Sequence, residues 1–347
     1  GKDRTPAWIP DVVLWQHHLP PFEAAVKAGA STIMINSASI NGMPAHASKY
    51  LLTDVLRGRF GFEGLVVSDW EDVIRLHTRH RVADTPREAV RMAVEAGLDM
   101  SMVPHDFSFA DHLVELVRSG DISEERIDRS VAIILRLKMK LGLFENPYAE
   151  PGAVANFGLP AYKRLALDAA RESMTLLKNR DGVLPLAKDA RILLAGPAAM
   201  NLGPLHGSWS YTWQGDKEAA YPPETLTLQE ALFEKLGIER VETVAAAGFD
   251  NEANQDAARL TEAAAESDVI VLALGEPAYA ESPGALDDLN LPEEQKSRVR
   301  AAAAPGKPVI MVLVEGRPRI VRDVEPLADG ILLAYQPGSQ GARAIVD

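Results

Sequence analysis

The chain contains no cysteine, and this absence excludes a disulfide framework and any metal site built on thiolates. Its 347 residues include no run of the ~18 to 20 apolar residues that a transmembrane helix needs. No Gly-x-Gly-x-x-Gly and no phosphate-binding loop follows its apolar runs, which argues against a nucleotide-binding protein. Basic residues are too few for nucleic acid or an anionic membrane as partner: 36 Lys and Arg stand against 49 Asp and Glu, a net charge of −13.

Apolar runs and helical segments alternate through residues 1–145. Runs at 32–36 and 65–68 predict strands, and helices are predicted at 49–57, at 86–96 and from Ser123 to near Gly142. Such alternation is typical of successive βα units in a parallel sheet or barrel. Residues 146–165 are punctuated by proline and glycine and predict an interdomain linker.

Residues 166–347 repeat the alternation and form a second predicted domain. Short apolar strands are expected at 191–195, 269–274, 308–314 and 330–334. Helical segments rich in alanine and glutamate separate them, for example at 255–266. The pattern predicts a doubly wound α/β sheet.

The triplet Ser68-Asp69-Trp70 directly follows the apolar run Leu65-Val66-Val67. A carboxylate at the C-terminal end of a parallel strand, beside an aromatic ring, is where an α/β barrel places a catalytic group for a sugar. Serine and aspartate after a strand are also common helix N-caps. These residues alone therefore leave two interpretations of Asp69, as a nucleophile or as a cap.

A long series of motifs resembles glycoside hydrolase family 3, in particular its β-glucosidases and exo-β-glucanases. The motifs are Leu19-Pro20-Pro21-Phe22, Thr32-Ile33-Met34-Ile35-Asn36, Ile40-Asn41-Gly42-Met43-Pro44-Ala45-His46-Ala47, Gly61-Phe62-Glu63-Gly64-Leu65-Val66-Val67-Ser68-Asp69-Trp70 and Ala96-Gly97-Leu98-Asp99-Met100. The resemblance implies an α/β fold: the C-terminal part of a (β/α)8 TIM-like barrel at 1–145, followed by a six-stranded α/β sandwich domain at 166–347. It also implies an active site between the two domains.

The resemblance places the nucleophile of this family on Asp69. A retaining glycosidase needs a second carboxyl group, and two glutamates follow the predicted strand at 269–274. The resemblance assigns the acid/base role to Glu281. Glu276 is the fallback, although its position near the strand end also suits a residue that accepts backbone amides and holds the loop in shape. A third interpretation makes both glutamates solvated loop residues.

The resemblance also indicates residues that bind the substrate. Aromatic rings pack against the C–H groups of sugars, and Trp70 and Trp213 match such positions. Arg75 matches an arginine near the subsite, with a surface salt bridge as the alternative.

Met34 and Ser37 match residues that line the pocket. Ser37 departs from the tyrosine of many relatives, so a hydrogen bond to the nucleophile region is lost unless Asn36 or Ser37 replaces it. The histidines lack zinc-ligand spacing, and the mechanism requires no metal or cofactor.

The resemblance predicts a retaining, exo-acting β-glucosidase that hydrolyses terminal β-D-glucosyl residues of β-glucosides or β-glucan oligosaccharides by double displacement. A β-xylosidase or dual-specificity β-glycosidase is an alternative, because it differs only in whether the pocket admits a C6 hydroxymethyl group. A noncatalytic carbohydrate-binding fragment is another. A related branch, the β-N-acetylglucosaminidases, takes its acid/base from an upstream histidine, so Glu281 and Trp213 favour the glucosidase branch.

The barrel of this family begins upstream of Pro20, and its sandwich continues past Ile345. An open half barrel would expose unpaired strand edges. We therefore expect a complementary segment or chain to supply the missing barrel strands.

Overall fold

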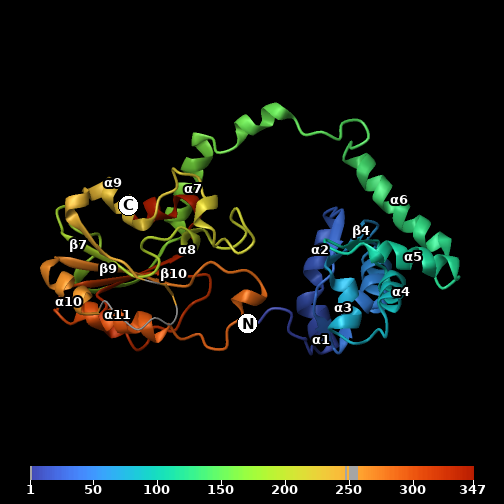
Figure 1. Cartoon of the computed structure of the whole chain (residues 1–347), viewed down its shortest axis with the longest axis horizontal. Helices are drawn as coiled ribbons and strands as arrows, with labels where there is room; N and C mark the ends of the chain where they lie inside the picture. The colour runs from blue at the N-terminus through green and yellow to red at the C-terminus, as the bar shows by residue number, and fades with distance from the viewer. Residues whose placement is uncertain (1, 247, 250–256) are drawn as a thin grey trace. The chain divides into compact units, whose positions relative to one another are not determined.

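The computed structural model describes residues 2–246, 248–249 and 257–347 and divides the chain into two compact units (Figure 1). The first unit is Arg4–Pro151. The second is Gly152–Asp347 together with the N-terminal residues up to Asp3. Among the described residues, no helix combines the length and the apolar composition of a membrane span.

The first unit is built on a three-stranded parallel sheet with the order β1-β4-β5. The strands are β1 (Thr32–Met34), β4 (Leu65–Trp70) and β5 (Met100–Met102). β4 runs two residues beyond the predicted strand, so Asp69 and Trp70 are its last residues. A short antiparallel ribbon of β2 (Ser39–Ile40) and β3 (Met43–Pro44) follows β1.

Helices precede, connect and follow these strands. They are α1 (Asp11–Val13), η1 (Leu14–His18), α2 (Pro20–Lys27), η3 (Tyr50–Arg59), α3 (Asp72–Thr78), α4 (Pro86–Ala96), α5 (Ser108–Arg118) and α6 (Glu124–Lys140). Of these, η3 lies between β1 and β4, and α3 and α4 lie between β4 and β5. Local chemistry sets their ends. The Thr85 side chain accepts the backbone N–H of Glu88 at the start of α4, and Ser123 accepts that of Arg126 at the start of α6.

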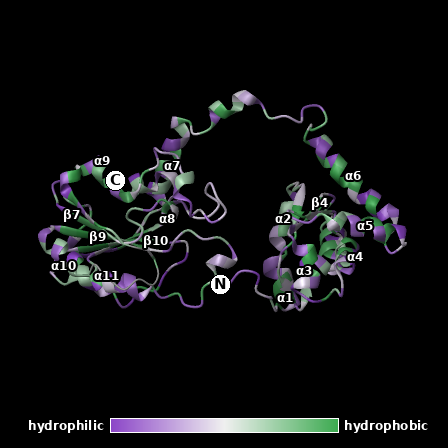
Figure 2. Ribbon diagram, in the orientation of Figure 1, coloured by the Kyte–Doolittle hydropathy of each residue, from purple (hydrophilic) through white to green (hydrophobic). Residues whose placement is uncertain are grey.

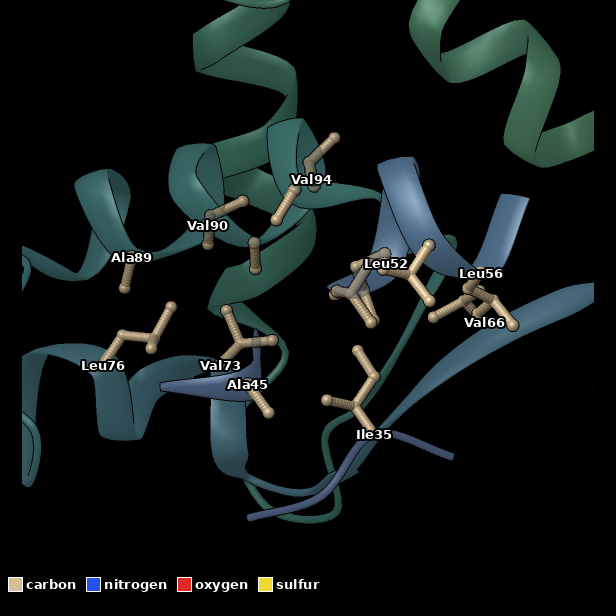
Figure 3. Packing of buried hydrophobic residues seen from close by; sticks show 14 of the residues in the cluster. Ile35, Ala45, Leu52, Leu56, Val66, Val73, Leu76, Ala89, Val90 and Val94 are labelled. Atoms are coloured by element: carbon tan, nitrogen blue, oxygen red, sulfur yellow. The ribbon is translucent and has the colours of Figure 1, made fainter. Parts of the chain in front are cut away.

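The core of the first unit lies around β4 (Figure 3). Val66 is fully buried, and Leu52 and Leu56 of η3 belong to the same cluster. Val73 and Leu76 of α3 join it together with the inner residues of α4. β4 is the central strand, whereas β1 and β5 are the edges of the sheet within the described residues.

The second unit contains a six-stranded sheet with the order β6-β11-β10-β9-β7-β8, in which only the β6–β11 pair is antiparallel. The strands are β6 (Thr175–Asn179), β7 (Ile192–Ala195), β8 (Val241–Val244), β9 (Val269–Gly275), β10 (Val309–Val314) and β11 (Gly330–Tyr335). The four predicted strands are present. The two edge strands, β6 and β8, were not predicted, because each is short and only partly apolar.

Both faces of this sheet are covered, which requires the strands to be apolar throughout (Figure 2). In β9, Val269, Val271 and Ala273 belong to one core cluster, and the alternate residues belong to another. The helices α9 (Leu228–Leu236) and α12 (Gly341–Val346) pack on the first cluster. The helices α10 (Ala257–Glu266) and α11 (Glu293–Ala303) pack on the second. Residues 255 and 256 of the predicted helix lie outside the described residues.

The strand order creates a switch point between β7 and β9. The chain passes from β7 to β8 on one side, and then returns to pair β9 on the other side of β7. In open α/β sheets, ligands bind at the carboxyl ends of the strands at such a point. The loops that leave β7 and β9 contain Trp213 and Glu281 respectively.

Replacing Leu272 by alanine tests this two-sided burial. Leu272 is fully buried in the central strand β9, so Leu272→Ala is expected to lower the free energy of unfolding by about 2 to 5 kcal/mol. The control Ile238→Ala removes a side chain that is 70% exposed and should cost under about 0.5 kcal/mol. Urea denaturation followed by circular dichroism measures both. Equal costs would contradict the two-layer covering of the sheet.

Candidate active site

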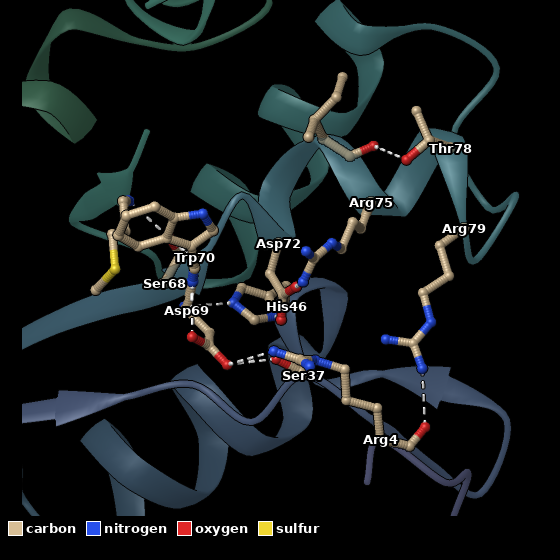
Figure 4. Close-up of polar contacts among 12 residues, drawn as sticks. Arg4, Ser37, His46, Ser68, Asp69, Trp70, Asp72, Arg75, Thr78 and Arg79 are labelled. Atoms are coloured by element: carbon tan, nitrogen blue, oxygen red, sulfur yellow. Dashed lines mark hydrogen bonds and ion pairs between the residues drawn. The ribbon is translucent and has the colours of Figure 1, made fainter. Parts of the chain in front are cut away.

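Asp69 lies at the end of β4, the central strand of the first unit, and its carboxylate is held from two directions (Figure 4). Ser37 Oγ donates to Asp69 Oδ2 at 2.5 Å, and the Trp70 backbone N–H donates to Asp69 Oδ1 at 2.7 Å. The Arg4 guanidinium lies 3.9 Å from Oδ2. The side chain is 25% exposed, so a fixed carboxylate remains accessible. Ser37 thus supplies a hydrogen bond to this carboxylate.

His46 lies behind Asp69 and is 2% exposed. Burial lowers the pKa of His46 to about 4, although the Asp72 and Asp69 carboxylates favour its charged form. The ring is therefore neutral near pH 7, and its Nε2 accepts the backbone N–H of Asp69 at 3.3 Å. This contact fixes the backbone from which the carboxylate projects.

Arg75 takes part in a buried ion pair rather than projecting alone. Its guanidinium donates to Asp72 Oδ1 at 2.7 Å, and Asp72 is 2% exposed. Asp72 Oδ2 in turn lies 3.8 Å from His46 Nδ1. Arg75 therefore connects with Asp69 through Asp72 and His46.

Ser68 ties the end of β4 to β5. Its hydroxyl accepts the Met102 backbone N–H at 2.7 Å and donates to the Asp69 carbonyl at 2.8 Å. The strand pairing is irregular between Val67 and Trp70, and Glu71 follows with a left-handed φ of 58°. Strained backbone held by its surroundings is a common feature of functional sites.

Exposed apolar side chains stand at the ends of the same strands. Met34 on β1 is 56% exposed, and Trp70 on β4 is 47% exposed with its ring edge-on to His105. The structure thus brings Asp69, Ser37 and Trp70 together in one unit. A carboxylate beside an accessible aromatic ring suits a sugar.

Glu276, at the end of β9, is completely buried and paired. The Arg317 guanidinium lies 2.8 Å from Glu276 Oε1 and the Arg319 guanidinium 3.0 Å from it, while the Arg317 backbone N–H donates to Oε2 at 3.0 Å. Gly275 precedes it with φ 134°, where a Cβ would lie 2.0 Å from the Val314 carbonyl. Both carboxylate oxygens of Glu276 are engaged inside the protein, which favours a structural role.

A second buried carboxyl group lies beside this cluster. Glu315 is 3% exposed and accepts the Arg319 backbone N–H. Burial raises the pKa of Glu315 to about 7. The hydrogen bond from the Arg319 backbone lowers this pKa, and the nearby Glu276 carboxylate raises it. The cluster therefore changes its net charge near neutral pH.

Glu281 differs from Glu276 in its exposure, its backbone conformation and its hydrogen-bond partners. It is exposed and has a positive φ of 51° with ψ −137°, a backbone conformation that non-glycine residues rarely adopt. The Trp213 indole Nε1 donates to Glu281 Oε1 at 3.3 Å, and Trp213 is 45% exposed. The structure therefore brings together the predicted acid/base and the predicted aromatic subsite residue of the second unit.

Several polar residues of the site were not predicted from the sequence. His46 lies within a family motif but has no predicted role, and Arg4 and Asp72 have none either. His46 and Arg4 contact Asp69, and Asp72 faces His46. For His46, the sequence signal that could have indicated a role at the site is its position as a polar residue inside a family motif. Within the described part of the chain, no three His, Cys, Asp or Glu side chains are grouped so as to hold a metal ion.

The first unit places an accessible carboxylate at the end of a parallel strand, and the second places another on a loop beyond its α/β sheet. Paired carboxyl groups are the catalytic groups of most glycoside hydrolases. The model "Glycosyl hydrolase family 3 N terminal domain" matches residues 1–137, and "Glycosyl hydrolase family 3 C-terminal domain" matches residues 174–347. The chain belongs to glycosyl hydrolase family 3. The predicted fold class, part of a (β/α)8 barrel followed by an α/β sandwich, is confirmed.

Individual relatives agree with this assignment. The "Lysosomal beta glucosidase" of Dictyostelium discoideum is 42% identical over 100% of this chain and 44% of its own length. A "Beta-xylosidase" of Formosa agariphila is 32% identical over 95% of this chain and 47% of its own. The solved β-glucosidase of Listeria innocua superimposes with a TM-score of 0.89 at 32% identity, over 100% of this chain and 46% of that one. It has also been solved with glucose and, as a mutant, with laminaribiose. The chain spans less than half the length of these relatives.

Replacing His46 by glutamine tests the neutral histidine behind Asp69. The pKa of His46 is about 4 in the folded protein, whereas it is 6.5 in the unfolded chain. As the pH falls from 6.5 to 4, the His46 ring therefore gains a proton in the unfolded chain but not in the folded protein. His46 therefore lowers the free energy of unfolding by about 3 kcal/mol between pH 6.5 and pH 4. His46→Gln keeps an acceptor for the Asp69 N–H and should flatten this part of the pH dependence. Denaturation at pH 7, 5.5 and 4.5 measures it, and parallel curves for the two proteins would contradict the buried neutral state.

Proposed function

We propose that the protein is a retaining, exo-acting β-glucosidase that releases terminal β-D-glucosyl residues from β-glucosides or β-glucan oligosaccharides. The observation that carries the proposal is Asp69, an accessible carboxylate at a strand end whose two oxygens are oriented by Ser37 and the Trp70 amide. Its backbone is further held by His46. Such pre-orientation is what a nucleophile needs for attack at an anomeric carbon.

The reaction proceeds in two displacements. In the first, an oxygen of Asp69 forms a bond to the anomeric carbon while the glycosidic bond breaks, and Glu281 gives its proton to the departing oxygen. In the second, Glu281 takes a proton from water, whose oxygen attacks the anomeric carbon and breaks the bond to Asp69. Net inversion at each step retains the configuration, and Glu281 and Asp69 return to their starting states.

The surroundings of Glu281 support its role as the acid/base. Proton transfer requires an accessible carboxyl group that reaches the substrate oxygen. Glu281 is exposed and is held in a strained conformation beside Trp213, whereas both oxygens of Glu276 are bound by Arg317 and Arg319. We therefore assign acid/base catalysis to Glu281 and loop support to Glu276. Trp213, Trp70 and Met34 offer exposed apolar faces to the sugar rings.

The identity of the glycone rests on the relatives. Two of the similar proteins are described as β-glucosidases, and the Listeria protein has been solved with glucose and laminaribiose. The Formosa relative favours a second candidate, a β-xylosidase or dual-specificity enzyme. The two activities differ in whether the pocket accepts the C6 hydroxymethyl group of glucose.

We further propose that another segment or chain supplies barrel strands that pair with β1. Within the described residues β1 has a partner on one side only, and its residues Thr32 and Met34 are exposed. A cavity of about 410 Å³ lies beside it, lined by apolar residues including Leu14, Ile33 and Phe60. Unpaired strand edges of this kind are normally covered in native proteins.

Asp69→Ala in the whole protein tests the nucleophile. Turnover of aryl β-glucosides should fall by at least ~10³-fold, because the covalent step is lost, while the fold is kept. A 2-deoxy-2-fluoro glucoside should label Asp69 in the wild type, as located by peptide mass spectrometry. The matching fluoro xyloside, run in parallel with aryl xylosides, decides between the two candidate activities. Labelling of another carboxylate would remove Asp69 from the nucleophile role.

Glu281→Ala tests the acid/base. Hydrolysis of poor leaving groups such as phenol should slow by about 10²- to 10⁴-fold, because these need a proton to depart, whereas dinitrophenyl glucosides should cleave at a nearly normal first step. Steady-state kinetics over a series of aryl leaving groups measures this difference. Glu276→Gln is the comparison variant. A leaving-group effect at Glu276→Gln and none at Glu281→Ala would reverse the assignment.

A further inference from the structure

We propose that Gln214 and Arg317 are positioning residues that clamp the Glu281 loop from both sides and so set the place of its carboxyl group. The inference rests on the proposed function, since it concerns how Glu281 is held for proton transfer. Each of the two residues binds the main chain of the loop rather than the Glu281 side chain. These two anchors therefore hold the loop through contacts that do not use the Glu281 carboxyl group.

Gln214 holds the residue immediately before Glu281. Its Oε1 accepts the Ala280 backbone N–H at 3.0 Å, and its Nε2 donates to the Ala280 carbonyl at 3.2 Å. This pair of bonds satisfies both main-chain groups of Ala280, which is 5% exposed. Gln214 also follows Trp213 directly, so one anchor fixes the loop next to both the aromatic residue and the acid.

Arg317 holds the other end of the short turn that follows Glu281. One guanidinium nitrogen donates to the Gly284 carbonyl, while Nε and the other nitrogen donate to Glu276 Oε1 at 3.2 and 2.8 Å. The buried charge of Glu276 thereby fixes the direction of the guanidinium. A lysine has no planar fork and cannot make both sets of contacts at once.

Tyr279 fills the space between the two anchors. The Arg317 guanidinium stacks over its ring, 3.9 Å from the ring centre. A Cβ on Gly284 would lie only 2.2 Å from Tyr279 Cδ2, so the turn can close over the ring only with glycine at this position. Burial, with a contribution from Glu276, raises the pKa of Tyr279 and keeps the phenol neutral as a packing group.

The two anchors leave Glu281 in a segment fixed at Ala280 and at Gly284. A non-glycine residue with φ 51° is strained and persists only where its surroundings determine the backbone. Releasing either anchor should let the backbone relax and displace the carboxyl group. A displacement of about 1 Å can cost ~10²-fold in rate when it affects the reacting geometry.

The test compares Gln214→Ala and Arg317→Lys with Glu281→Ala in the whole protein, using phenyl and dinitrophenyl β-glucosides. Each clamp variant should lose about 10- to 100-fold in kcat/KM on the phenyl substrate and less than about 3-fold on the dinitrophenyl substrate. The alkaline limb of the pH profile, which reports the acid, should shift in the same variants. Gln229→Ala, which removes a hydrogen bond to Thr243, and Arg180→Lys, which alters an exposed pair with Asp329, are matched controls and should change neither value.

Equal losses on both substrates, or no loss, would overturn the clamp, because a merely structural defect lowers the amount of active enzyme and affects all substrates alike. If Arg317→Lys does not fold, Gln214→Ala decides alone, since the half-buried Gln214 carries no buried charge. A selective loss for Gln214→Ala then supports the clamp. If Glu281→Ala itself shows no leaving-group effect, the proposed acid/base assignment fails and the clamp with it, whereas a selective Glu281→Ala beside unselective clamp variants overturns only the clamp.

Discussion

The structure depends on its central parallel strands, such as β4 and β9, which are buried over most of their length and leave charged side chains a place only where they end. Val66 in β4 and Leu272 in β9 are completely buried, and a charge at either position would have no solvent and no partner. The carboxylates accordingly follow the apolar runs, Asp69 at the end of β4 and Glu276 just beyond β9. In the second unit the strand order adds a switch point between β7 and β9, from which the loops with Trp213 and Glu281 emerge.

The two units accommodate buried titratable side chains near these strand ends in different ways. In the first, His46 stays neutral because burial outweighs the attraction of Asp72 and Asp69, so it can accept a backbone N–H rather than compete for a carboxylate. In the second, Glu276 is kept inside the protein by two guanidinium groups, a combination that is strongly destabilised when one partner is lost. The first arrangement orients the accessible Asp69 carboxylate. The second arrangement forms the base of the loop that carries Glu281.

Features that depend on local sequence signals could be predicted, whereas features that depend on contacts between distant residues could not. Strands such as β9 and helices such as α4 were predicted because apolar periodicity and capping residues are local signals. The edge strands β6 and β8 were missed because half-exposed short strands lack that signal. The resemblance indicated Asp69 and Glu281 as candidate site residues. The contacts made by His46, Gln214 and Arg317 join residues far apart in the chain and were not predicted. No spacing in a sequence reports that Gln214 meets Ala280.

The hydrogen bond from the Trp213 indole to Glu281 has an optical consequence. Indole emission responds to the electric field at the ring, and the field at Trp213 depends on where the carboxyl group that accepts its N–H lies. Trp213 therefore acts as a built-in fluorophore for the position of the Glu281 side chain. A change in the conformation of the Glu281 loop would alter this emission through the indole nitrogen.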